Sequence, residues 1–75
     1  MTQLDVVFRY SVPPSSRELR ALDGVREVYG IRRISFNERE RMVRVEFDAS
    51  RLTAAVVAGL LRDAGLAITE RVQLA

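Results

Sequence analysis

The chain has 75 residues, of which 48% are hydrophobic, and this length fits one domain over residues 1–75 with a thin core. It carries a formal charge of +2 and has no cysteine and no histidine, which excludes a disulfide framework, a thiolate metal site and a Ser-His-Asp triad. It also has no apolar run of the ~20 residues that a membrane span requires, so we expect a soluble, cytoplasmic protein without membrane insertion.

The first third of the chain predicts a strand followed by a helix. Apolar side chains alternate along residues 4–10, as in a half-buried strand, and a Pro-Pro pair ends it because proline cannot donate to a sheet ladder. Two serines follow as helix-capping residues, with Glu18 in the first turn. Apolar residues then recur at helical spacing to about Val28, and Gly30 is typical of a position just past a helix end.

The remainder predicts a hairpin, a second helix and a final strand. Residues 31–36 and 42–47 alternate around a short polar turn, which is typical of a hairpin. Turn and cap residues at 48–50 precede an apolar helical stripe over residues 52–64, and a glycine ends this helix. Residues 68–74 alternate again and predict the last strand.

This order of elements predicts an α+β fold, the ferredoxin-like βαββαβ sandwich. Its four-stranded antiparallel sheet would carry both helices on one face. The alternation directs Phe8, Phe36 and Phe47 into the core. We expect residues 31–36 to form an exposed edge strand, and this edge, together with the thin core, favours a homodimer.

The open face of the predicted sheet is expected to be basic. The same alternation places Glu46 there with four arginines, Arg9, Arg33, Arg44 and Arg71. These arginines are candidate contacts for an anion or a partner protein. Glu46 is expected to pair across strands with Arg9 or Arg33. Because the face has no aromatic side chain on which bases could stack, nucleic-acid binding is not expected.

Several segments together resemble a known family. Residues 30–37 read Gly-Ile-Arg-Arg-Ile-Ser-Phe-Asn, residues 43–48 read Val-Arg-Val-Glu-Phe-Asp, and the second predicted helix ends in Ala64-Gly65-Leu66. This pattern is similar to the heavy-metal-associated domain, the small module of copper chaperones and metal-pumping ATPases. The resemblance implies a ferredoxin-like fold, a link to metal transport, and a metal-transporting ATPase as a partner.

The metal motif of that family is absent from this sequence. In the family, a Met-Thr-Cys-x-x-Cys loop joins the first strand to the first helix, and its two cysteines align with Pro14 and Arg17. The degenerate loop positions here are Pro13, Pro14, Ser15, Ser16 and Arg17. Soft metals such as Cu(I) prefer thiolate ligands, so the resemblance carries over no metal ligand and no cofactor is expected.

The serines at the predicted helix start leave two interpretations open. Free N–H groups at a helix N-terminus attract anions, and Arg17 and Arg20 stand in the first turn, so a phosphate or carboxylate could dock at Ser15 and Ser16. The alternative is a plain helix cap beside a solvated face.

These features predict a non-catalytic module rather than an enzyme. The first hypothesis is a protein-interaction or regulatory domain linked to metal transport, which binds a protein partner or itself. One alternative is a small-ligand sensor of the ACT type, which shares the βαββαβ order. Another is weak binding of a hard metal by oxygen ligands, with Asp48, Glu46, or Glu38 and Glu40 as the candidates.

Overall fold

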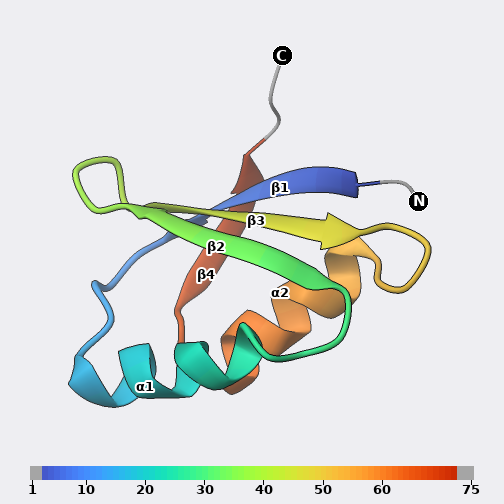
Figure 1. Ribbon diagram of the computed structural model, residues 1–75. Coiled ribbons are helices and arrows are strands. Elements are labelled where there is room, and N and C mark those ends of the chain that lie inside the picture. Colours follow the sequence, from blue (N-terminus) through green and yellow to red (C-terminus); the bar gives the residue numbers. More distant parts are fainter. Residues whose placement is uncertain (1–2, 73–75) are drawn as a thin grey trace.

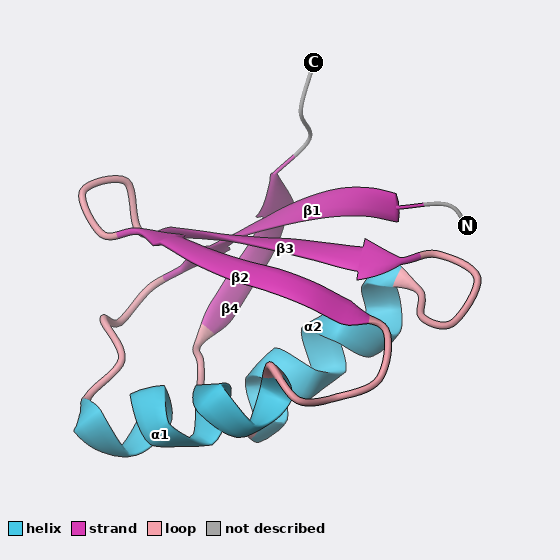
Figure 2. Cartoon of the chain, viewed as in Figure 1, coloured by secondary structure: helices cyan, strands magenta, loops and turns pink. Residues whose placement is uncertain are grey.

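One antiparallel sheet carries both helices on the same face in the computed structural model, which describes residues 3–72 (Figure 1). The sheet has the strand order β2-β3-β1-β4. The elements in chain order are β1 (Gln3–Tyr10), α1 (Ser16–Val25), β2 (Ile31–Asn37), β3 (Met42–Asp48), α2 (Ala54–Asp63) and β4 (Ile68–Val72). Figure 2 shows the opposite face of the sheet without a helix. The predicted βαββαβ sandwich is therefore confirmed.

The core lies between the sheet and the two helices. Because successive strand residues point to opposite faces, every second side chain of β1 and β3 enters it. Phe8 and Phe47 are buried as predicted, whereas Phe36, on the edge strand, is only partly buried and meets Tyr10 edge to face at a centroid distance of 6.1 Å. The buried cluster comprises Val6, Phe8, Tyr10, Leu22, Val25, Ile31, Ile34, Val43, Val45, Phe47, Val57, Ala58, Leu61 and Leu66.

The first helix ends at Val25, three residues before the predicted Val28. The N–H groups of Glu27 and Val28 bond to carbonyls three residues back, at 3.2 and 3.0 Å, which tightens the chain into a turn. Gly30 then takes a φ of +104° and leads into β2. Val28 keeps the helical spacing of apolar residues although it lies beyond α1, because it still packs against the core from the loop that follows the helix.

The second helix begins at Ala54 rather than at the predicted Leu52. Thr53 is its cap, with Oγ1 accepting the Val56 N–H at 3.2 Å. The segment 48–50, predicted to supply turn and cap residues, forms the turn before the helix but does not cap it. There Asp48 Oδ1 accepts the N–H and the hydroxyl of Ser50, at 2.9 and 2.6 Å. Both bonds lower the pKa of Asp48, the hydroxyl bond most.

The last strand carries a bulge that reverses its two faces. Tyr10 pairs with Ile68, but Arg9 pairs with Glu70, so Thr69 is an extra residue. Beyond this point Glu70 and Val72 lie on the open face and Arg71, opposite Phe8, lies on the helix side. The predicted placement of Arg71 on the open face is therefore wrong, and Leu74, in the predicted strand, lies outside the described residues.

Neither helix is a membrane-spanning candidate. Each has 10 residues, and within residues 3–72 no helix is long and apolar enough to cross a bilayer.

Replacing Gly30 with alanine is expected to lower the free energy of unfolding by about 1–3 kcal/mol, because its positive φ strains any L side chain. An added Cβ would also lie 3.1 Å from Leu52 Cδ1 and 3.2 Å from Arg51 Cβ. The matched control is Gly24→Ala inside α1, where an added Cβ meets no atom beyond its own helix within 4 Å among the described residues. That substitution is expected to stabilise by about 0.5–1 kcal/mol, so urea unfolding curves that shift in the same direction would contradict the argument.

Candidate functional site

The loop that carries the degenerate metal-motif positions is fastened to the rest of the fold. It joins β1 to α1 at the end of the molecule where the β2–β3 hairpin also lies, at the left of Figure 1. Arg41 of the hairpin holds it, since its Nη1 donates to the Ser11 carbonyl at 2.9 Å and its own carbonyl accepts the Tyr10 N–H at 3.0 Å. The Ser11 N–H donates to the Ala67 carbonyl at 3.0 Å. The start of the loop is therefore well anchored.

The start of α1 is closed by a carboxylate of the helix itself. Glu18 Oε1 accepts the Ser15 N–H at 3.1 Å and the Ser15 hydroxyl at 2.8 Å, as in a capping box. The backbone bond, followed by the hydroxyl bond, lowers the pKa of Glu18. A negative charge therefore already occupies the position where an anion would bind. Of the two interpretations of Ser15 and Ser16, the structure favours the helix cap.

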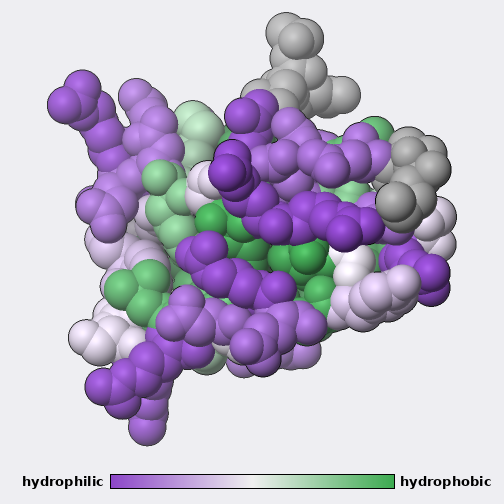
Figure 3. Space-filling model, in the orientation of Figure 1, coloured by the Kyte–Doolittle hydropathy of each residue, from purple (hydrophilic) through white to green (hydrophobic). Residues whose placement is uncertain are grey.

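Apolar side chains surround this loop on the outside of the molecule. Val12 is 61% exposed and Leu19 is 44% exposed, although Leu19 belongs to the predicted apolar stripe of α1. Hydrophobic surface is visible between the hairpin and the N-terminal end of α1 in Figure 3. Beside it is a hollow of about 320 Å³, lined by Tyr10, Pro13, Pro14, Leu19, Phe36 and Glu38. We call Val12, Pro13, Pro14, Leu19 and this hollow the loop-end surface.

One carboxylate borders this hollow. Tyr10 is buried beneath it, and burial, then the charge of Glu38, raises the pKa of its phenol. The charge of Arg41, the residue that holds the loop, lowers the pKa of the same Tyr10 phenol. The hollow is thus mainly apolar, with one acidic group, that of Glu38, at its border.

The open face of the sheet is neutral rather than basic. Three of the four predicted contact arginines lie there, and each has an acidic partner. Arg9 Nε lies 3.0 Å from Glu70 Oε1, Arg44 Nη2 lies 3.5 Å from Asp5 Oδ2, and Arg33 Nη1 lies 4.0 Å from Glu46 Oε2. The predicted pairing of Glu46 with Arg33 is confirmed. The fourth, Arg71, lines a hollow on the helix side with Leu4 and Phe47.

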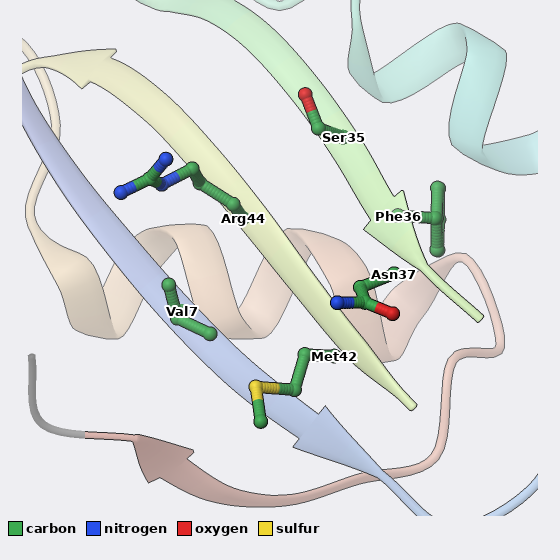
Figure 4. Close-up of a pocket in the computed structure, with 6 residues that line it drawn as sticks. All are labelled: Val7, Ser35, Phe36, Asn37, Met42 and Arg44. Carbon is green, nitrogen blue, oxygen red and sulfur yellow. The ribbon is translucent and has the colours of Figure 1, made fainter. Parts of the chain in front are cut away.

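A third hollow, of about 280 Å³, lies on this open face (Figure 4). β1, β2 and β3 supply its lining, which is Val7, Ser35, Phe36, Asn37, Met42 and Arg44. Val7 is only 6% exposed, so the centre of the face is apolar. The arrangement offers hydrogen-bonding groups but no paired acid and base, because its one ionised group, Arg44, is the partner of Asp5.

The carboxylates proposed for hard-metal binding do not gather. Within residues 3–72 no group of three or more acidic, histidine or cysteine side chains could hold a metal ion. Asp48 Oδ1 already accepts the Ser50 hydroxyl, and Glu46 Oε1 accepts a hydrogen bond from Gln3 Nε2 at 2.9 Å. Glu38 and Glu40 lie in the exposed hairpin turn.

β2 lies at the edge of the sheet, as predicted, but an arginine covers part of that edge. Arg26, just after α1, donates from Nη1 to the Ile34 carbonyl at 3.1 Å, and its Nε lies 3.5 Å from Asp23 Oδ1. A side chain that satisfies an edge carbonyl opposes pairing with another chain. This contact weakens the argument for a homodimer through β2.

Replacing Arg26 with alanine is expected to increase self-association, because it uncovers the Ile34 carbonyl and removes a charge from the edge. The effect should grow with salt, which screens the remaining Arg32 and Arg33. Sedimentation velocity over a range of protein concentrations measures it. Arg20→Ala, at an exposed site on α1, is the control, and equal sedimentation of the two variants would contradict the edge-covering role.

Sequence reasoning did not identify Arg26, Arg41 or the exposed Leu19. Arg26 and Arg41 act through backbone carbonyls of other segments, which leaves no local pattern. Val12 did carry a signal, since it is an apolar residue directly before a Pro-Pro pair in a loop.

Several solved structures share this fold. The solution structure of apo-CopP from Helicobacter pylori matches with a TM-score of 0.73 and 24% identity, over 88% of this chain and 100% of that one. Oxidized MerP from Ralstonia metallidurans CH34 matches with a TM-score of 0.72 and 16% identity, over 91% of this chain and 96% of that one. No protein-family model and no curated protein sequence matches the chain. The likeness shows the fold alone, a ferredoxin-like βαββαβ sandwich shared by this chain and both structures.

Proposed function

We propose that the chain is a non-catalytic, heavy-metal-associated-like module that docks onto a protein of a metal-transport system instead of carrying the metal. Three findings support this: the fold shared with apo-CopP and oxidized MerP, a sequence without cysteine or histidine, and an apolar loop in place of the metal motif. In this proposal the module works in the cytoplasm and regulates or recruits its partner.

The loop-end surface is the observation that carries the proposal. Pro14 and Arg17 stand where the family resemblance puts two thiolates, and exposed Val12 and Leu19 flank them. An apolar patch beside a recess is typical of a protein contact, because burying it removes apolar area from water. The anchoring of Ser11 by Arg41 keeps the patch ordered, which lowers the entropic cost of docking.

The partner we propose is a metal-transporting ATPase. The resemblance to the domains of such pumps is the reason for this choice, and Glu38 at the border of the recess would face a basic group of the partner.

Crosslinking in the source cells, followed by mass spectrometry, tests the proposal. Wild-type chain should recover a metal-transporting ATPase, and Leu19→Glu should lose it. The matched control is Val56→Glu on α2, since Val56 is 48% exposed against 44% for Leu19 and lies outside the loop-end surface. Equal recovery of the ATPase with both variants would show that the loop-end surface is not the docking site. A stoichiometric Cu(I) or Zn(II) adduct of the wild type in native mass spectra would reject the metal-free role.

A further inference from the structure

The outer edge of β2 is a free strand edge that Arg26 covers at one point. β2 has β3 on one side and no other strand among residues 3–72 on the other. The Ile34 carbonyl points to this outer side, because it accepts Arg26 Nη1 at 3.1 Å. The two-residue alternation of a strand directs the backbone groups of Phe36 the same way. The edge therefore offers ladder positions to an added strand.

The covering contact is easily exchanged. Arg26 has a side chain that is 45% exposed, and its ion pair with the 75% exposed Asp23 spans 3.5 Å, so solvent weakens the pair. An incoming backbone N–H can replace the guanidinium at the Ile34 carbonyl. The displaced guanidinium then becomes available to a carboxylate on the incoming strand.

The two charged side chains of β2 itself, Arg32 and Arg33, are both positive and face solvent. Arg32 and Arg33 are 48% and 71% exposed, whereas their acidic partners, Asp48 and Glu46, are 5% and 23% exposed. The pairs span 3.8 and 4.0 Å, longer than a close charge-assisted hydrogen bond. A strand that approaches β2 therefore meets these two guanidinium groups before it meets Asp48 or Glu46, and the exposed carboxylate nearby, Asp23, is paired with Arg26.

The same charges disfavour a second copy of the chain. Antiparallel pairing of two β2 strands centred on Ile34 would gather Arg26, Arg32 and Arg33 of both copies along one seam, and like charges across strands repel. An acidic strand has the opposite charge, so the same arginines attract it. We propose that the β2 edge receives an extended, acidic segment of a partner protein as a fifth strand. This inference does not depend on docking at the loop-end surface.

A phage-displayed library of random peptides of about eight residues, the length of an ordinary strand, tests this with the intact chain as bait. Enriched peptides are expected to carry acidic residues at alternate positions. In amide NMR spectra, a synthetic copy of the best peptide should shift the signals of Ile34 and Phe36 and slow their hydrogen exchange. Affinity should fall with added salt.

Arg33→Glu is the decisive variant, because Arg33 is the most exposed arginine of the edge pairs and its change leaves the core intact. This substitution should weaken the binding of the acidic peptide by about tenfold. Arg33→Gln should give a smaller loss, and Arg62→Glu, the same charge change at the end of α2, should leave affinity unchanged. Enrichment of neutral or basic peptides, absence of enrichment, shifts confined to other strands, or a β2-paired dimer of the free chain would each overturn the proposal.

Discussion

Replacing Pro14 and Arg17 together with cysteine is expected to produce a chain that binds one Cu(I) tightly, whereas the natural chain binds none. These two positions align with the thiolates of the resembled family, and the loop between β1 and α1 is already held by Arg41. Thiolates are the ligands that Cu(I) prefers, and the N-terminus of α1 favours the thiolate form. The gain should be large, since structural zinc sites in small peptides contribute on the order of 10 kcal/mol of metal-binding free energy and a thiolate pair offers Cu(I) ligands of the same kind.

The control for this experiment is Pro14→Ser with Arg17→Ser. It removes the same proline and arginine but supplies oxygen instead of sulfur, so any effect of loop freedom alone appears in both variants. Competition with a chromophoric Cu(I) chelator measures the affinity. Equal affinities of the cysteine and serine variants would mean that the loop does not have the geometry of the family's metal loop, and the family alignment of this end would have to be abandoned.

Leu61→Ala is expected to lower the free energy of unfolding by about 2–5 kcal/mol, because Leu61 is fully buried and its loss leaves a cavity. A domain of this kind has a total stability of about 5–15 kcal/mol, so the variant should be near the threshold of folding. Leu60→Ala is the matched control. It deletes the same atoms one residue earlier on α2, where the side chain is only partly buried.

Urea unfolding monitored by circular dichroism measures both leucine variants. Leu60→Ala should lose less than half as much as Leu61→Ala, since the transfer and cavity contributions both scale with burial. Similar midpoints for the two variants would contradict the described orientation of α2 against the sheet.

The two proposed contacts use different chemistry on neighbouring parts of the molecule. The loop-end surface is apolar and includes the hollow that Pro13 and Pro14 help to line. The β2 edge is a backbone surface with exposed arginines. Phe36 belongs to β2 and also lines the recess, so the two surfaces meet at the end of this strand. One partner protein could therefore engage both, and the variants Leu19→Glu and Arg33→Glu separate the two contributions.

Local pattern was sufficient to predict the element order and the core. Alternating apolar residues define the strands, helical spacing defines the helices, and the order of these six elements led to the sheet with two helices on one face. The absence of cysteine and histidine, read directly from the sequence, removes the family's thiolate site. These properties depend on residues close together along the chain, which is why periodicity and composition express them.

Only the tertiary structure decided which side chains each surface presents. The bulge at Thr69 moved Arg71 to the helix side, and a bulge depends on the register with β1 rather than on the strand's own pattern. Leu19 stays exposed although it continues the apolar stripe of α1, because coverage depends on what packs against the helix. Arg26 reaches Ile34 and Arg41 reaches Ser11 across gaps in sequence. The candidate site was thus determined by the pairing register between distant strands and by which elements pack over each helix face. No local sequence pattern encodes either property.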